Sequence, residues 1–243
     1  MDPVLIILLC STGAVLTAPL GLLPLRGERR MPLRRIGWAN ALAAGFMLGN
    51  AVVLAEAGLR YPPLLGAVGA LLGIGFTFWT HLASGTADWD LNRLDETPPD
   101  YGYKVLLVGT LHAASEGVAI GVAMLVGIPF GILVALTMAL HNMPEGTVLG
   151  AVLRANGVAF GHAAGLAAAT NVGQIFLAIS TYAVISVVPA AFPAANGFAV
   201  GALIYLSLSE LLPESYRQAG PTGVAVAASV AMGVVVLLKG VAP

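Results

Sequence analysis

Long apolar stretches fill most of the chain, and short polar or proline-containing turns separate them. An apolar stretch of about 20 residues is long enough to cross a bilayer as a helix. Eight such stretches follow one another, which predicts an all-α membrane protein folded as one bundle of eight transmembrane helices. The predicted spans are residues 3–25, 36–57, 64–83, 105–126, 131–153, 158–188, 197–212 and 222–241.

Composition agrees with this pattern. The 243 residues are 58% hydrophobic and only 9% charged, whereas soluble domains carry about 25% charged residues. A net charge of -1 gives no reason to expect a nucleic-acid partner. The single cysteine, Cys10, excludes an internal disulfide and any zinc site built from several cysteines. The expected partners are therefore the lipid bilayer and small ions.

Charge in the loops predicts the orientation. The connection between the first two spans is rich in arginine, which is typical of cytoplasmic loops. It contains Arg26, Arg29, Arg30, Arg34 and Arg35. With eight spans, both termini are then extracytoplasmic, and the apolar N-terminus is expected to be a first span, not a cleaved signal peptide. The long connection 84–104 is acidic and would be cytoplasmic; a solvated linker is favoured over a cation-collecting loop.

One ten-residue pattern occurs twice, inside the fourth and fifth spans. Both copies read His-x-x-x-Glu-Gly-x-x-x-Gly, first at 112–121 and again at 141–150. Histidine and glutamate four residues apart project from the same face of a helix. The turn at 127–130 makes the two spans antiparallel neighbours, which places Glu116 level with His141 and His112 level with Glu145. Two imidazoles and two carboxylates are thus predicted to meet within the membrane.

Such groups indicate a cation site. An ionisable side chain at membrane depth is costly unless it is paired or hydrated. Neutral histidine and carboxylate are ligands of zinc, and they also bind iron and manganese. A buried histidine–glutamate network that only fixes two helices is the simpler alternative, but the duplication favours a functional site. Pro144 is expected to kink the fifth span beside His141, freeing the carbonyl of Leu140.

Other polar residues in the spans carry weaker signals. Asn142 is either an oxygen ligand or a helix-packing residue. Asn171 and Gln174 are treated mainly as packing groups that could line a pathway, and Glu210 is the better candidate for the cation route. His81 and His162 lie near span ends, where a hydrated histidine needs no special explanation. Four glycine pairs with four-residue spacing predict close helix packing, namely Gly117/Gly121, Gly146/Gly150, Gly161/Gly165 and Gly197/Gly201.

These motifs resemble the ZIP family of zinc and iron transporters, in its prokaryotic GufA-like branch. The segment 141–146, His-Asn-Met-Pro-Glu-Gly, is similar to the complete fifth-span signature of the family. The segment 112–117 is similar to the fourth-span signature, with Ala113 in place of Asn and Ser115 in place of Pro. Residues 201–215 resemble the seventh-span pattern, and 43–47 are similar to the second span.

The resemblance implies eight spans with both termini extracytoplasmic, import toward the cytosol, and movement of one bundle against another, often in a homodimer. The carried-over metal ligands are His112, Glu116, His141, Asn142 and Glu145. Ala113, Thr170 and Ser209 depart from the family pattern at positions tied to a second metal, and they leave the first position intact.

The sequence therefore predicts a multi-pass transporter of the cell membrane, or of the inner membrane in a Gram-negative bacterium. Its substrate is expected to be Zn²⁺, with Fe²⁺ and Mn²⁺ as alternatives and without an organic cofactor. It is not expected to be an enzyme. Two rivals stay open: an intramembrane metal-dependent hydrolase and a non-transporting metal sensor or scaffold. The zincin motif His-Glu-x-x-His and the motif Gly-x-Ser-x-Gly are both absent.

Overall fold

The computed structural model describes residues 2–27, 31–84 and 101–241, and within these ranges the chain is helical without any strand. The acidic part of the connection predicted at 84–104 thus lies largely outside the described residues. The helices are α1 (Pro3–Val15), α2 (Leu33–Gly58), α3 (Pro63–Ser84), α4 (Tyr101–Val126), α5 (Ile128–Ala155), α6 (Phe160–Thr170), α7 (Val172–Val187), α8 (Phe192–Leu206), α9 (Leu212–Ala219) and α10 (Pro221–Val241).

The prediction of eight spans is confirmed. In the described ranges, eight helical segments are long and apolar enough to cross a membrane. Three of them are composite. The first joins α1 to a 3₁₀ segment, Ala18–Leu25; the sixth joins α6 to α7. The seventh runs from Pro189 through α8 and a π-helical turn, Ser207–Leu211, into α9.

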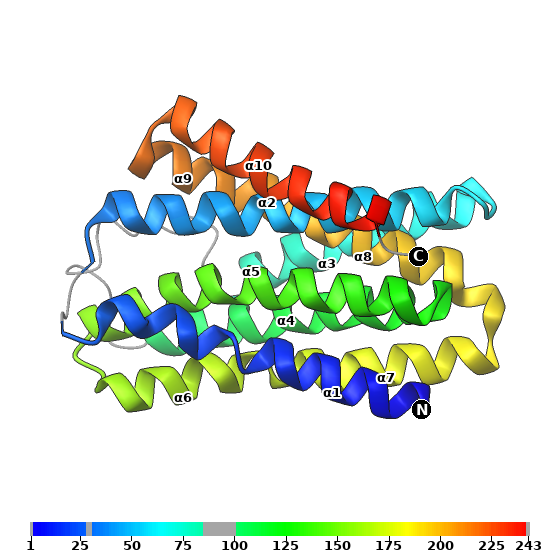
Figure 1. Cartoon of the computed structure of the whole chain (residues 1–243), viewed down its shortest axis with the longest axis horizontal. Helices are drawn as coiled ribbons and strands as arrows, with labels where there is room; N and C mark the ends of the chain where they lie inside the picture. The colour runs from blue at the N-terminus through cyan, green and yellow to red at the C-terminus, as the bar shows by residue number, and fades with distance from the viewer. Residues whose placement is uncertain (1, 28–30, 85–100, 242–243) are drawn as a thin grey trace.

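The helices form two groups that pack against each other (Figure 1). One group contains α2, α3, α8, α9 and α10, and we call it the α2 bundle. The other contains α1 with its 3₁₀ segment and α4 to α7, and we call it the α5 bundle. Contacts within each bundle are extensive, and the bundles meet mainly through α2 against α5 and α4 against α8. Both termini lie at the same end of the molecule, opposite the connection from α1 to α2 (Figure 1).

The break in the first span fixes it against α5. Between α1 and the 3₁₀ segment, the hydroxyl of Thr17 donates to the carbonyls of Ala14 and, on α5, Ala139. The hydroxyl of Thr147 donates to the carbonyl of Gly21 at 2.8 Å. The carbonyl of Gly21 thus accepts from a side chain of α5, and the carbonyl of Ala139 on α5 accepts from Thr17, as buried polar groups require. The same break positions the α5 segment that carries the second copy of the repeated pattern.

Glycines let the site helices approach their neighbours closely. Gly117 and Gly121 of α4 pack on α7, and Gly146 and Gly150 of α5 pack on the 3₁₀ segment. The third pair, Gly197 and Gly201, packs on α3. Small residues at these positions allow backbones to meet, as predicted.

The fourth glycine pair behaves differently. Gly161 and Gly165 are exposed on α6, and a methyl group added at either would meet no atom within 4 Å. Close packing within the chain is thus found for three of the four pairs. Four-residue spacing alone does not say which face of a helix the pair occupies.

Candidate metal centre

Two groups of histidine and glutamate side chains lie in the described part of the bundle. Each group has three ligand atoms within 4.8 Å of one another. The first contains Glu116, His141 and Glu145 and is called the first centre here. The second contains His81, His112 and Glu210 and is called the second cluster. Two ligand atoms of one tetrahedral zinc ion are about 3.4 Å apart, so both groups are close to a metal-binding arrangement.

The first centre joins α4 to α5 at the level that the repeated pattern predicts. Nε2 of His141 lies 3.1 Å from Oε1 of Glu116 and 3.8 Å from Oε2 of Glu145. The side chain of Glu116 is fully buried, and that of Glu145 is 24% exposed. A carboxylate without any contact to solvent needs a compensating positive charge. Here that charge is expected between the two carboxylates and the imidazole.

The orientation of His141 is fixed from the α2 bundle. Its Nδ1 lies 3.1 Å from the carbonyl oxygen of Ala43 on α2. A carbonyl can only accept, so Nδ1 carries the proton and donates it. In a neutral ring the lone pair of Nε2 then faces the carboxylate oxygens of Glu116 and Glu145. Three lone-pair atoms that converge in this way repel one another until a cation or a proton lies between them. Zinc-binding histidines commonly donate their second nitrogen to a carbonyl in the same manner.

Amide side chains hold the other oxygen of Glu116. Nε2 of Gln174 donates to Oε2 of Glu116 at 3.2 Å, and Nδ2 of Asn142 donates to Oε1 of Gln174 at 3.2 Å. Asn142 also donates to the carbonyl of Ala14 at 3.0 Å. Its own Oδ1 is buried and has no hydrogen-bond partner among the described residues. Gln174 therefore positions Glu116, while Asn142 keeps one oxygen available beside the first centre.

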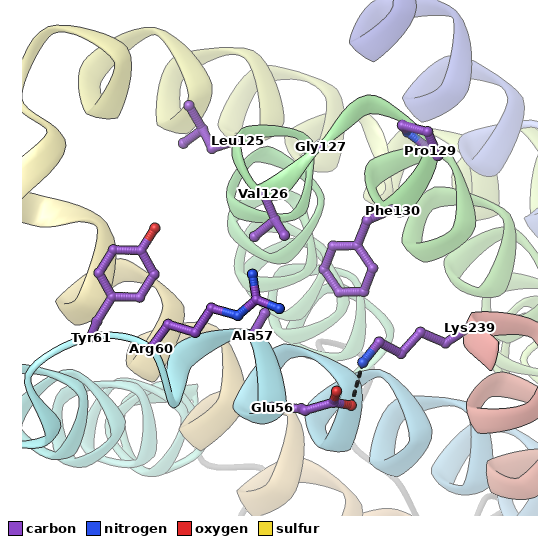
Figure 2. Close-up of a pocket in the computed structure, with 10 residues that line it drawn as sticks. All are labelled: Glu56, Ala57, Arg60, Tyr61, Leu125, Val126, Gly127, Pro129, Phe130 and Lys239. Carbon is purple, nitrogen blue, oxygen red and sulfur yellow. Dashed lines mark ion pairs between the residues drawn. The ribbon is translucent and has the colours of Figure 1, made fainter. Parts of the chain in front are cut away.

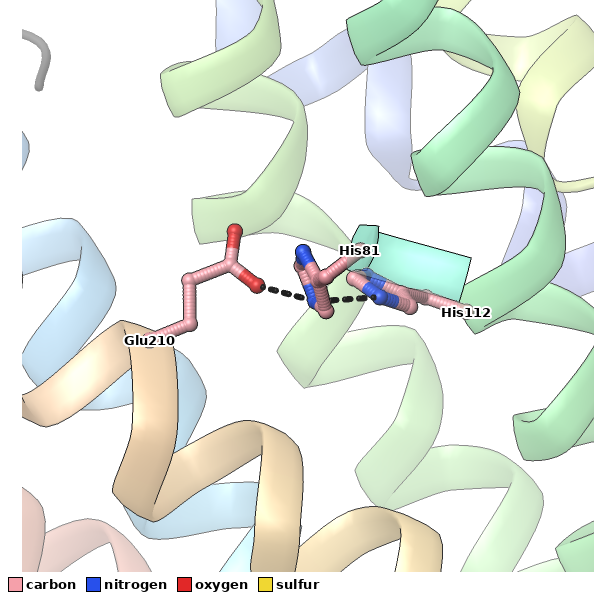
Figure 3. A group of neighbouring side chains, drawn as sticks. All are labelled: His81, His112 and Glu210. Atoms are coloured by element: carbon pink, nitrogen blue, oxygen red, sulfur yellow. Dashed lines mark hydrogen bonds and ion pairs between the residues drawn. The ribbon is translucent and has the colours of Figure 1, made fainter. Parts of the chain in front are cut away.

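His112 is the predicted ligand that the structure places elsewhere. Instead of meeting Glu145, its ring turns toward α3, where its Nε2 lies 3.1 Å from Nε2 of His81. Nε2 of His81 lies 3.0 Å from Oε2 of Glu210, which stands on the π-helical turn of the seventh span (Figure 3). The predicted group of four is thus divided into the first centre and the second cluster, which are neighbours along α4.

The structure places the predicted pathway residues at different locations. Gln174 contacts the first centre, and Glu210 belongs to the second cluster. Asn171 lies at the junction of α6 and α7, and its described hydrogen bonds go to the carbonyl of Ala167 and the hydroxyl of Thr170. His162 is exposed at the start of α6. No hydrogen bond described for Asn171 joins it to either group.

His81 was interpreted as a hydrated residue, and this was wrong because it is buried. A signal for its burial exists in the sequence. Gly69, Gly73, Thr77 and His81 follow one another at four-residue intervals, so they share one face of α3, and all four are buried. Gly69 and Gly73 pack on α8. The face that carries His81 is therefore the face that meets the seventh span.

The seventh span also departs from α-helical geometry at Glu210. The turn Ser207–Leu211 is π-helical, and Pro213 follows in the first turn of α9. Proline lacks the N–H that would bind the carbonyl of Ser209, so the regular hydrogen-bond ladder is interrupted there. Single π-helical turns are frequent at functional sites.

Two curated proteins are similar to this chain. A protein of Arabidopsis thaliana that is provisionally named a zinc transporter is 30% identical over 200 residues, which are 81% of this chain and 32% of the relative. Zinc transporter GufA of Myxococcus xanthus is 37% identical over 113 residues, which are 46% of this chain and 44% of the relative. No protein-family model matches the chain.

The chain spans about a third of the first relative's length and less than half of the second. Both names are those of zinc transporters, and the second is GufA itself. The resemblance to the GufA-like branch of the ZIP family is therefore confirmed.

Proposed function

We propose that this ZIP-like chain moves a divalent metal ion, Zn²⁺ before Fe²⁺ or Mn²⁺, across the membrane toward the cytosol by alternating access. The ion is the substrate, and it binds Glu116, His141 and Glu145 between α4 and α5, with Oδ1 of Asn142 as an additional oxygen. The observation that carries this proposal is the convergence of Nε2 of His141 with two carboxylates, one of them fully buried. A doubly charged ion neutralises both carboxylates and removes much of their cost.

The orientation of the chain is inferred from charge, and import is the direction that the family resemblance implies. The connection between α1 and α2 carries the arginine cluster and lies at the end opposite both termini (Figure 1). Arginine-rich short loops are retained in the cytoplasm, so this end is taken as the cytoplasmic one. Along α4, Glu116 is followed toward that end by His112. The second cluster includes Glu210, whose side chain is 16% exposed. An ion leaving the first centre in that direction meets these groups next.

A cavity of about 370 Å³ lies at the opposite end (Figure 2). It is lined by the end of α2, including Ala57, by the turn between α4 and α5, including Phe130, and by an ion pair of Glu56 with Lys239. None of the lining residues belongs to the first centre or the second cluster. The cavity therefore stands where an ion from the extracytoplasmic side would enter.

A buried hydrogen bond and buried apolar side chains lie between this cavity and the first centre. Along α2, Asn50 lies between Ala57 at the cavity and Ala43 beside His141. The hydroxyl of Thr137 on α5 donates to Oδ1 of Asn50 at 2.6 Å. Apolar side chains that are fully buried surround this contact, and they include Met47, Leu54, Val134 and Met138. Such packing supports a state that is closed toward the termini, as one half of an alternating-access cycle requires.

The test is uptake of radioactive Zn²⁺ by liposomes that contain the purified protein. The His141→Ala variant is expected to reduce uptake by at least about 100-fold, because it removes a ligand and leaves two carboxylates without a partner. His162→Ala is the matched control, since this exposed histidine lies away from both groups, and its uptake should equal that of the wild type. Unchanged uptake by a folded His141→Ala protein would refute the proposal. Hydrolysis of lipid or peptide without flux would favour an enzyme instead.

A smaller effect is expected at Gln174. Leucine there removes the donor to Oε2 of Glu116 and leaves the amide of Asn142 with one partner fewer. Loss of such a supporting contact typically weakens metal binding by about 10–100-fold. Isothermal titration of Zn²⁺ into the Gln174→Leu variant measures this. Ser186→Ala serves as the control. Ser186 is exposed on the same helix, and its hydroxyl donates to the backbone carbonyl of Tyr182 in that helix.

A further inference from the structure

We propose that His81, His112 and Glu210 form a second binding site for a divalent cation, which exists only while the two bundles adopt the arrangement seen here. This inference deepens the proposed function and rests on it, because it takes the bound ion to be the transported substrate. It assigns a ligand role to His81 of α3, a residue outside the repeated pattern.

The geometry of the second cluster suits a metal ion. Nε2 of His81 is 3.0 Å from Oε2 of Glu210 and 3.1 Å from Nε2 of His112 (Figure 3). The three ligand atoms lie within 4.8 Å of one another. Two imidazole nitrogens and one carboxylate oxygen are a common zinc ligand set, and they leave a fourth position for water or an exchanging ligand.

Oε2 of Glu210 gives an independent sign of a missing partner. This oxygen is buried, and it accepts no hydrogen bond of normal geometry from the described residues, although His81 is near it. Proximity without alignment leaves its lone pairs available. Buried carboxylate oxygens normally have partners, and the same deficiency occurs at Oε2 of Glu145 in the first centre. Each candidate site thus contains one buried carboxylate oxygen whose hydrogen-bonding capacity is not used.

The ligands of the second cluster come from both bundles. His112 stands on α4 of the α5 bundle, whereas His81 and Glu210 stand on α3 and the π-helical turn of the α2 bundle. The three ligands of the first centre all stand on α4 and α5. Movement of one bundle against the other would therefore preserve the first centre and separate the ligands of the second cluster.

The two groups are close enough for an ion to pass between them. His112 and Glu116 are four residues apart on α4, which corresponds to a rise of about 6 Å. In the present arrangement an ion released from Glu116 and His141 meets His112 after about one helical turn. The second cluster would then take over the ion on its way out, and it would hold the bundles in this arrangement while occupied.

A plain hydrogen-bonded network is the competing explanation. A protonated Nε2 of His81 could share its hydrogen between Glu210 and Nε2 of His112, and the three residues would then only join α3, α4 and the seventh span. That network needs no ion, so it predicts a single metal ion per chain. Counting bound ions in the purified protein separates the two explanations without any measurement of transport.

Equilibrium dialysis of the full chain against radioactive Zn²⁺ is the experiment. Wild-type protein should bind two ions per chain. His81→Ala and, independently, Glu210→Gln should bind one, and His141→Ala should retain the ion of the second cluster. His162→Ala should bind two. A single ion on the wild type, or two ions on either folded variant of the second cluster, would overturn the proposal. Two second-cluster variants are used so that misfolding of one does not decide the result.

Zn²⁺ uptake by the same proteins in liposomes keeps this inference distinct from the proposed function. His81→Ala is expected to lower uptake by about 10-fold, because the first centre still fills while release is slower. Uptake by the wild type together with a single bound ion would refute the second site and support the proposed transport function. Two bound ions without any uptake would refute the proposed transport function and support the second site.

Discussion

Replacing Glu116 by glutamine is expected to abolish Zn²⁺ uptake and, at the same time, to make the metal-free protein more stable. Glu116 is fully buried, 3.1 Å from His141, and its centre contains a second carboxylate, that of Glu145. Glutamine keeps the shape. Its carbonyl oxygen accepts from Gln174, and its amide donates to the Nε2 lone pair of His141. Every contact of the side chain is then satisfied without an ion.

The expected magnitudes follow from removing a buried charge. Replacing buried charges by neutral groups of similar volume is often neutral or stabilising by up to about 4 kcal/mol, and here Glu145 is still present beside His141. At about 2–4 °C per kcal/mol for a chain of this size, the thermal transition of the metal-free variant should rise by several degrees. Zn²⁺ affinity should fall at least about 100-fold, because the remaining donors have lost half of their negative charge.

Thermal unfolding with and without Zn²⁺ measures both effects. Wild-type protein should be stabilised by the metal, since a ligand that binds only the folded state raises its stability. The thermal transition of the metal-free Glu116→Gln protein should be higher than that of the wild type, and Zn²⁺ should raise it only by the smaller amount that binding at the second cluster gives. Ser115→Ala is the matched control: this neighbouring side chain bonds the carbonyl of His112 in its own helix, and it should respond to Zn²⁺ like the wild type. A Glu116→Gln protein that Zn²⁺ stabilises as strongly as the wild type would contradict the assignment of Glu116 as a ligand.

The number of spans and the first centre could be derived from the sequence because both depend on local periodicity. Apolar stretches of sufficient length define the spans. The short turn after Val126 makes α4 and α5 antiparallel. Counting residues from this turn therefore predicts that Glu116 and His141 lie at the same height along the two helices. The structure agrees, with 3.1 Å between their side-chain atoms.

The partner of His112 could not be derived in this way. It lies on α3, and residues 85–100 separate that helix from α4, so no turn of known length fixes their relative level. Counting along the chain gives His112 only one candidate, Glu145. The packing of Gly69 and Gly73 on α8 sets the orientation of α3, because it turns the face of α3 that carries His81 toward the interior.

Breaks in the spans were also beyond the sequence pattern. Hydropathy averages over a whole turn and does not distinguish an α-helix from a 3₁₀ or π-helical turn. At the break in the first span, the hydroxyl of Thr17 donates to the carbonyl of Ala139 on another helix, and the local sequence does not reveal this contact. The bonds that hold the first span against α5 are thus tertiary contacts, which depend on how closely the two segments approach each other.

That close approach depends on Gly146, and alanine at this position is expected to cause the largest loss of stability among these predictions. A methyl group there would collide with the backbone carbonyl of Ala18 in the 3₁₀ segment. Backbone cannot move aside as a flexible side chain does, so the first span must shift away from α5. Forced overpacking costs about 1–3 kcal/mol or more, and the shift also strains the bonds of Thr17, Asn142 and Thr147 to their partners across this contact.

The thermal transition of Gly146→Ala should therefore fall by about 2–12 °C, at about 2–4 °C per kcal/mol. Zn²⁺ affinity should fall with it, because Asn142 loses the carbonyl of Ala14 and no longer holds Gln174 against Glu116. Gly161→Ala is the matched control, since its methyl group meets no atom within 4 Å and alanine favours a helix by up to about 1 kcal/mol over glycine. A Gly146→Ala protein as stable as the Gly161→Ala protein would show that the first span does not depend on this contact, and the support of the first centre by the first span would have to be abandoned.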